Sequence, residues 1–222
     1  EEYYDHIDAD PTFFAREILG IELWGRGDKW GTTGNGQIQV AESVRKNKAT
    51  LVTGCNGSGK STLFSILAME FVQRPGRVML IAGSEEQLEQ TTWPKFREFY
   101  EDNEDRIPVR GKMHERSLVI TPGWDVQCVV TKEKSRLTGR HPERLLIIAD
   151  EGIILEDPFF FAVRTMLQGG GCRVVVGLNP DRKDCAAYRR AYKNPRTWHS
   201  LALSALDHPN IKLGREVMNG GP

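Results

Sequence analysis

The octapeptide GCNGSGKS, Gly54 to Ser61, satisfies every fixed position of the phosphate-binding loop pattern G-x-x-x-x-G-K-[ST]. An apolar run typical of a β-strand, residues 49–53, precedes it, and a helical run, residues 60–72, follows it. This strand-loop-helix context is the one that the motif requires. The three glycines let successive backbone N–H groups point at phosphate oxygens, beside the positive end of the following helix. The stretch therefore predicts a nucleotide-binding site.

Individual positions of this loop have distinct expected roles. We expect Lys60 to neutralise the β and γ phosphates and Ser61 to offer its hydroxyl to Mg²⁺. The rest of the expected nucleotide contacts come from the loop and the start of the helix: Gly54, Cys55, Asn56, Gly57, Ser58, Gly59 and Thr62. A chance glycine turn before a buried helix is the alternative, and the flanking strand and helix disfavour it.

Composition limits the classes of protein that this chain can be. Its 222 residues suit one domain, or one domain with a small appendage. Thirty basic and thirty acidic residues cancel, so any contact with nucleic acid must be local. The four cysteines lack metal-ligand spacing, which favours reduced thiols. No apolar run reaches membrane-spanning length, and the acidic opening is unlike a signal peptide, so we expect a soluble intracellular protein.

Apolar runs alternate with helical segments along the chain. Continuous apolar runs bounded by charge are typical of strands buried on both faces of a parallel sheet. The pattern predicts an α/β fold, a parallel sheet sandwiched by helices. Strands are predicted at 49–53, 77–82, 117–121, 125–131, 145–149, 172–177 and 198–203, and helices at 10–20, 37–46, 60–72, 85–101, from 157 to the glycines at 169–171, and 183–193.

The run LLIIADE, residues 145–151, supplies what the phosphate loop lacks. It is a buried strand that delivers Asp150 to the carboxyl end of the sheet, where α/β proteins bind ligands. We expect Asp150 to hold Mg²⁺, and the adjacent Glu151 to polarise a water for attack on the γ phosphate. This pairing indicates hydrolysis rather than transfer. An acid that ends a strand for solubility or helix capping is the alternative.

The distance along the chain between the two motifs refines the fold class. Lys60 and Asp150 are ninety residues apart, which leaves room for an extra strand between the two motif strands. Together with the tandem acid, this indicates the ASCE division of P-loop NTPases, in which a catalytic glutamate follows the Walker B aspartate. Small-molecule kinases and GTPases are disfavoured.

A third candidate follows the next buried strand, in the tetrapeptide GLNP, residues 177–180. Asn179 is placed to hydrogen-bond the γ phosphate or the attacking water, as a sensor of hydrolysis. An Asn-Pro turn that simply ends a strand is the alternative.

With these motifs in order, the sequence resembles the ATPase domain of the terminase large subunit, the motor that packages DNA into tailed-phage heads. DPTFFAREILGIELW, residues 10–24, is similar to the family's lead-in, and GRHPERLLIIADE, residues 139–151, to its Walker B segment. Residues 174–211 are similar to its coupling motif, followed by a tryptophan-histidine strand and an S-A-x-D-x-P-N signature. The resemblance implies a RecA-like fold of the ASCE division and ATP as nucleotide.

The resemblance also implies a division of the chain. Residues 1–48 correspond to a helical lead-in that carries an adenine-reading glutamine, and residues 49–222 to the ATPase core. Gln37 falls at the expected place for that glutamine, and Gln39 is the alternative. Full-length terminases continue into a metal-dependent nuclease domain, which this chain does not contain, so we expect no DNA cleavage.

The loop departs from the family in one respect that affects the mechanism. Family members often carry an arginine in the loop, where this chain has Cys55, Asn56 and Ser58. The second cation must therefore come from elsewhere. The resemblance implies a trans-acting arginine from the segment before Walker B, with Arg140 as first choice, Arg136 as second and Arg144 as a further candidate. Ordinary surface arginines are the alternative.

The implied function is Mg²⁺-dependent ATP hydrolysis that drives double-stranded DNA into a procapsid in the host cytoplasm. Expected partners are the portal protein, the terminase small subunit and copies of this chain in a ring, with the isolated domain monomeric and no membrane involved. Two alternatives stay open: a superfamily 2 helicase-like or other DNA-remodelling ATPase, and a slow nucleotide-dependent switch. Six basic residues are candidates for a DNA contact, or else form a solvated helix face: Arg182, Lys183, Arg189, Arg190, Lys193 and Arg196.

Overall fold

A computed structural model describes residues 2–131, 143–193 and 197–218. In this part of the chain eight strands form one sheet, in the order β3-β4-β5-β2-β6-β7-β1-β8. Six neighbouring strands, from β5 to β8, run parallel, and β3 and β4 add an antiparallel edge. The strands are β1 (Ala49–Gly54), β2 (Arg77–Ala82), β3 (Lys112–Met113), β4 (Ser117–Thr121), β5 (Trp124–Val130), β6 (Leu145–Ala149), β7 (Cys172–Leu178) and β8 (His199–Leu203).

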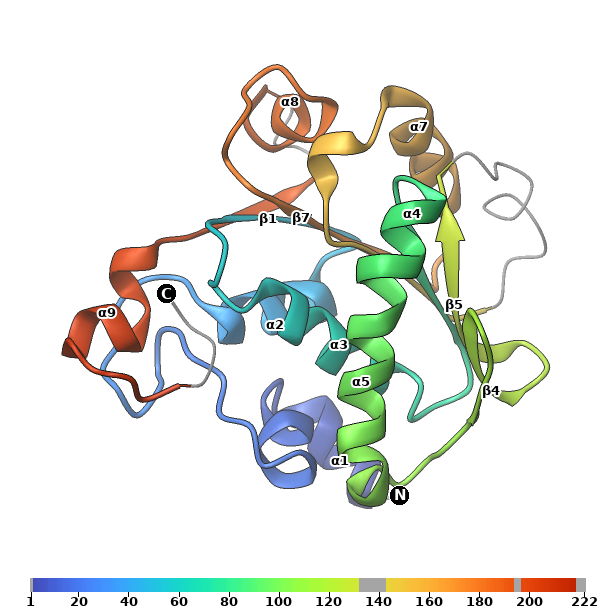
Figure 1. Ribbon diagram of the computed structural model, residues 1–222, viewed down its shortest axis with the longest axis horizontal. Helices are drawn as coiled ribbons and strands as arrows, with labels where there is room; N and C mark the ends of the chain where they lie inside the picture. Colours follow the sequence, from blue (N-terminus) through green and yellow to red (C-terminus); the bar gives the residue numbers. More distant parts are fainter. Residues whose placement is uncertain (1, 132–142, 194–196, 219–222) are drawn as a thin grey trace.

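Helices cover both faces of this sheet. Figure 1 shows α7 and α8 on one side and α2, α3 and α5 on the other. The α-helices are α1 (Glu2–Ala9), α2 (Gln37–Lys46), α3 (Lys60–Phe71), α4 (Glu85–Gln87), α5 (Trp93–Asn103), α7 (Asp157–Met166), α8 (Ala186–Lys193) and α9 (Pro209–Leu213). Shorter helical turns are π-helical at Phe14–Ile18 and Leu88–Thr92 and 3-10 at Glu104–Arg106, Gly152–Ile154 and Ala205–Asp207. The predicted α/β class, a parallel sheet between helices, is confirmed.

The central strands alternate between two hydrophobic cores, one on each face. In β2, Leu80 packs into the core beneath α2, α3 and α5, whereas Met79 and Ile81 pack into the core beneath α7 and α8. Side chains of a strand point alternately to opposite faces, so a strand buried on both faces is apolar at most of its positions. Each such side chain contributes about 1.5–3 kcal/mol on burial. This explains why the uninterrupted apolar runs of the sequence located the central strands.

The sheet order confirms the extra strand between the two motifs. β7 pairs in parallel with β1, which leads into the phosphate loop, and with β6, which ends before Asp150. The residue that follows β7, Asn179, therefore lies between the two motifs at the carboxyl edge of the sheet. Sheet order alone thus brings the three sequence motifs to one edge.

The N-terminal region differs from the prediction. The expected helix from Asp10 to Gly20 is a turn, in which the Asp10 carboxylate accepts from the Thr12 N–H at 2.7 Å, followed by one π-helical turn. An additional helix, α1, precedes it, and it buries one apolar residue, Ile7. Its polar sequence carries no helical stripe, so it was not predicted. Phe14, Leu19 and Trp24 are fully buried in the same core as α3, so the lead-in packs against the ATPase-like core.

Candidate functional site

The phosphate loop connects the end of β1 to the first turn of α3. Gly57 and Gly59 have φ angles of 79° and 78°, the left-handed region that glycine enters without a steric penalty. Gly54 is required for space, since a Cβ there would lie 3.0 Å from the Ser58 hydroxyl and 3.1 Å from Leu203 Cβ. The loop therefore turns sharply enough to present backbone N–H groups at the positive end of α3, an arrangement that binds phosphate.

Lys60, the first residue of α3, folds back onto its own loop. Its ammonium group donates to the carbonyl oxygens of Gly54 at 2.7 Å and Cys55 at 2.8 Å, and to the Ser58 hydroxyl at 3.3 Å. Burial lowers the pKa of Lys60, and the nearby Asp150 carboxylate works in the opposite direction. A phosphate in this loop offers the buried ammonium a full negative charge in place of neutral carbonyls.

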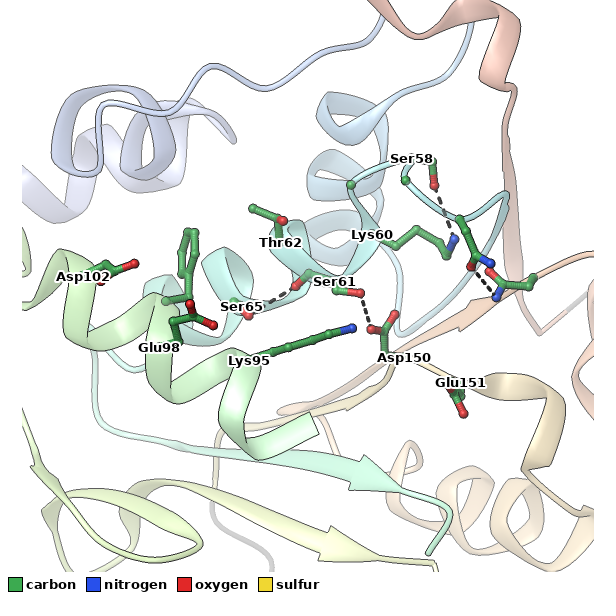
Figure 2. Close-up of a pocket in the computed structure, with 15 residues that line it drawn as sticks. Ser58, Lys60, Ser61, Thr62, Ser65, Lys95, Glu98, Asp102, Asp150 and Glu151 are labelled. Atoms are coloured by element: carbon green, nitrogen blue, oxygen red, sulfur yellow. Dashed lines mark hydrogen bonds between the residues drawn. The ribbon is translucent and has the colours of Figure 1, made fainter. Parts of the chain in front are cut away.

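Ser61 and Asp150 meet across the edge of the sheet. The Ser61 hydroxyl donates to Asp150 Oδ2 at 2.5 Å, although the residues are 89 positions apart (Figure 2). Hydroxyl and carboxylate oxygens are the hard donors that Mg²⁺ prefers, and Mg²⁺ is held by one or two protein groups together with water and phosphate. The two side chains fit the role of Mg²⁺ ligands predicted for them.

Glu151 and Asn179 complete the carboxyl edge. Glu151 follows Asp150 and is exposed, and its carboxylate diverges from the Ser61–Asp150 pair (Figure 2). The Asn179 amide donates to Asn56 Oδ1 at 2.9 Å, so the end of β7 is bonded to the phosphate loop.

These residues line one cavity of about 650 Å³, a size in the range of sites for drug-sized ligands. One wall is the phosphate loop with the Ser61–Asp150 pair, and the opposite wall is helix α5 (Figure 2). The lining residues are Asn56, Gly57, Ser58, Gly59, Lys60, Ser61, Thr62, Ser65, Lys95, Glu98, Phe99, Asp102, Asp150, Glu151 and Asn179.

The α5 wall was missed by sequence reasoning. The helix at 85–101 was predicted without any role in the site, but Lys95, Glu98, Phe99 and Asp102 line the cavity. These four residues follow the spacing i, i+3, i+4, i+7, which puts them on one helix face. Glu101 lies outside this set and pairs with Arg97 at 2.7 Å on the exposed surface. The spacing indicates that these residues share one face of the helix, but the sequence does not tell which face of the helix turns toward the site.

Gln37, the expected adenine reader, begins α2 directly behind the phosphate loop. Its amide N–H donates to the Gly59 carbonyl at 3.0 Å, and its amide oxygen accepts from the Trp24 N–H at 3.3 Å. It is buried and absent from the described lining of the cavity. The alternative, Gln39, accepts from the Gly36 and Arg26 N–H groups. In this conformation Gln37 anchors the loop, and its role toward adenine stays a prediction.

The three candidate arginines are placed differently. Arg136 and Arg140 lie outside the described residues, so their assignment stays a prediction. Arg144 precedes β6 and lies at the amino edge of the sheet, where it donates to the carbonyls of Phe71, Arg74 and Pro75, each at 3.2 Å. Its guanidinium also stacks on the Phe71 ring at 4.0 Å. Within one chain Arg144 is therefore at the opposite edge from Lys60.

Several of the basic residues considered for DNA contact are bound to acids within the chain. Arg182 pairs with Asp184 at 2.9 Å. Arg189 and Arg190 of α8 both pair with Asp157, at 3.0 and 2.7 Å. Arg196 and the side chain of Lys193 lie outside the described part of the structure. Three of the six basic residues thus pair with acids of the same chain, in agreement with the alternative that they are ordinary solvated side chains.

Three further features concern metals, thiols and membranes. All four cysteines are free. Among the residues that the structure describes, no group of three or more His, Cys, Asp or Glu side chains is arranged to hold a metal ion. Within the same residues, none of the helices has the length and apolarity needed to cross a membrane.

Comparison with known proteins places the fold. Neither family models nor curated protein sequences give a match. Among solved structures, the large terminase of bacteriophage HK97 superposes with a TM-score of 0.59 at 13% identity, over 89% of this chain and 43% of that one. The large terminase ATPase domain of Thermus phage P74-26 gives a TM-score of 0.58 at 16% identity, over 89% of this chain and 87% of that domain. A third large terminase, from a thermophilic bacteriophage, gives 0.54 at 11% identity, over 76% and 44%.

The fraction of each terminase chain that is covered identifies the part of those proteins that this chain matches. This chain spans about two fifths of the HK97 large terminase but nearly the whole of the isolated P74-26 ATPase domain. The similarity therefore concerns the ATPase portion, in agreement with the resemblance found in the sequence motifs. The chain has the P-loop NTPase fold of phage large-terminase ATPase domains.

Proposed function

We propose that this protein is the ATP-hydrolysing motor domain of a phage large terminase, which couples hydrolysis to the movement of double-stranded DNA into a procapsid. The observation that carries the proposal is the hydrogen bond between Ser61 and Asp150, with Glu151 beside it and Asn179 bonded to the phosphate loop. This combination joins a phosphate site, a metal site, a base and a relay at one edge of the sheet.

The chemistry follows from these groups. The loop N–H groups and Lys60 would hold the phosphates, and Ser61 and Asp150 would hold Mg²⁺, which lends positive charge to the phosphate oxygens. The Glu151 carboxylate takes a proton from a water molecule while the oxygen of that water forms a bond to the γ phosphorus. The bond from that phosphorus to the β–γ bridging oxygen breaks, and ADP and inorganic phosphate result.

Coupling to DNA needs a path from the hydrolysis site to a moving surface. Asn179 is bonded to Asn56 of the loop, so loss of the γ phosphate alters the segment between β7 and α8. We infer that a ring of copies acts on DNA together with a portal protein and a small subunit in the host cytoplasm. In the ring a neighbour's Arg140 or Arg136 would supply charge to the γ phosphate, and this chain alone would not cleave DNA.

The test is the steady-state ATPase rate against protein concentration, with and without linear duplex DNA, and with Mg²⁺ or EDTA. The proposal expects a steep rise with concentration, stimulation by DNA, loss in EDTA, and loss of the rise in Arg140→Ala with nucleotide binding intact. A rate per subunit that is independent of concentration and of DNA would contradict the motor assignment.

Two other functions share the same motifs. A superfamily 2 helicase-like ATPase would unwind a forked duplex, and a slow switch would bind ATP with almost no turnover. No observation in the described residues favours either one over the motor. Unwinding or single-turnover kinetics in the same preparations would identify them.

A further inference from the structure

Lys95 of helix α5 reaches across the cavity toward the predicted metal and phosphate site. Figure 2 shows its extended side chain with the ammonium end directed at Ser61 and Asp150. It lines both the main cavity and a smaller one of about 50 Å³ behind Asp150. Lys95 is exposed, and no hydrogen bond or ion pair joins it to another described residue. A cation is thus aimed at the site without a polar partner among the described residues.

The core sets the direction in which Lys95 points. Trp93, Phe96 and Tyr100 form the buried stripe of α5, with the Trp93 and Phe96 rings stacked at 5.4 Å. Rotation of α5 about its axis would expose these three large side chains to water. This exposure costs about 1.5–3 kcal/mol for each apolar side chain. Lys95 is therefore held on the cavity face by packing that involves no charge.

The charges around the cavity show what this cation can do. Two lysines, Lys60 and Lys95, face four carboxylates, those of Glu98, Asp102, Asp150 and Glu151. Within the loop GCNGSGKS, Lys60 is the one cationic residue, since Cys55, Asn56 and Ser58 carry no positive charge. Without Lys95, a triphosphate would therefore enter a site whose side chains carry one cation against four acids.

We propose that Lys95 binds the γ phosphate of ATP from within the same chain and supplies the second cation that the phosphate loop lacks. This inference rests on the proposed ATPase function. It assigns Lys95 as a substrate-binding residue that distinguishes ATP from ADP, because the γ phosphate is the part that ADP does not have. Charge-assisted hydrogen bonds of this kind are the strong ones in binding sites.

The test compares affinities for two nucleotides rather than rates. Dissociation constants of Mg-ADP and of a non-hydrolysable Mg-ATP analogue are measured by titration calorimetry on the unaltered chain and on three variants, Lys95→Ala, Lys95→Gln and Lys95→Arg. Arg97→Ala is the matched control, since Arg97 is a cation two residues further on the same helix, pairs with Glu101 and does not line the cavity.

We expect Lys95→Ala and Lys95→Gln to weaken binding of the ATP analogue about 10- to 100-fold, the range of a hydrogen bond to a charged group, and ADP binding less than twofold. Lys95→Arg should retain most of the preference for ATP, and Arg97→Ala should change neither constant. Equal weakening of both nucleotides, or no change in either while the variant unfolds at the normal temperature, would overturn the assignment. Failure of the unaltered chain to bind any nucleotide would instead overturn the proposed function.

Discussion

The charged side chains at the two edges of the sheet are paired to different extents. At the carboxyl edge, Glu151 and Lys95 face an open cavity and form no ion pair with a described residue. At the amino edge, cations are bound: Lys48 donates to the Leu167 carbonyl at 3.0 Å, Arg144 to the end of α3, and Arg173 to the Arg45 carbonyl at 3.2 Å.

Helix direction explains this difference. In a parallel sheet the connecting helices run opposite to the strands, so their negative carboxyl ends lie at the amino edge and their positive amino ends at the carboxyl edge. The accepting carbonyls lie at helix ends: Leu167 at the end of α7, Phe71 at the end of α3 and Arg45 at the end of α2. Each carbonyl accepts a hydrogen bond from a cation located at the start of a strand. The negative edge is thus neutralised within the chain, whereas the positive start of α3 is left for a ligand.

The two edges should therefore be separable by mutation. Substitutions at the carboxyl edge should alter nucleotide handling and leave the free energy of unfolding nearly unchanged. Substitutions at the amino edge should do the reverse. For Glu151, Asp125 and Arg144, nucleotide binding and unfolding are both measured, so that a variant at either edge can contradict this separation.

The largest effect is expected for Glu151→Gln. The amide keeps the shape of the side chain but cannot take a proton from the attacking water, so kcat should fall by a factor on the order of 10² to 10⁴. The dissociation constant for Mg-ATP and the urea midpoint should match those of the unaltered chain. Substantial remaining turnover would mean that another group acts as the base.

Asp125→Ala should cause the largest loss of stability. Asp125 is 3% exposed, and Arg77 donates to its two oxygens at 2.7 and 2.9 Å. Removing one partner of a buried pair leaves an uncompensated charge, so the free energy of unfolding should fall by about 3–5 kcal/mol in urea titrations.

The control for Asp125→Ala is Arg97→Ala, which breaks the exposed pair with Glu101. Such a pair contributes only about 0.3–0.5 kcal/mol, so this variant should unfold near the normal urea concentration. Both variants should bind Mg-ATP normally. Weakened nucleotide binding in folded Asp125→Ala would show that the two edges are coupled.

The pH dependence of stability should depend on Glu70. Its side chain is 12% exposed and pairs with Arg45, and burial raises its pKa from 4.5 to about 7. Between pH 4.5 and 7 the Glu70 carboxyl group is therefore protonated in the folded state and ionised in the unfolded state. The free energy of unfolding falls as pH rises through this window. The loss should amount to about 3 kcal/mol. Glu70→Gln should remove this part of the pH dependence; parallel curves for the two proteins would disprove it.

The sequence predicted the parts of the fold that depend on continuous patterns. The run before Asp150 is apolar at every position and the run before Gly54 at all but Thr50 and Thr53, as expected for strands buried on both faces, and the glycines of the loop report its backbone shape directly. Both motifs therefore lay at the correct strand ends, and the extra strand between them followed from the number of intervening residues.

The remaining features depend on tertiary packing. Helix α1 has a mostly polar sequence and is attached by contacts with residues distant in the chain, such as the Tyr4 hydroxyl to the Gln73 carbonyl at 3.0 Å and Arg74 to the Asp8 carboxylate at 2.8 Å. The face of α5 that turns toward the cavity is decided by the burial of Trp93 and its neighbours, which a local pattern does not connect to a site formed by distant parts of the chain. Likewise, the position of Gln37 behind Gly59 arises from packing of the lead-in.

Arg144→Met is expected to have the smallest effect, and it tests the comparison most directly. Methionine retains much of the apolar contact with Phe71 but cannot donate to the three carbonyls at the end of α3, so the free energy of unfolding should fall by about 1–3 kcal/mol. Mg-ATP binding and the ATPase rate of the assembled protein should stay within twofold. The opposite result, normal stability with a large loss of turnover only when subunits assemble, would mean that Arg144 leaves these carbonyls and acts on a neighbour's nucleotide. A cation at the amino edge of one subunit would then act at the carboxyl edge of its neighbour. The two edges would be functionally separate only within a single chain.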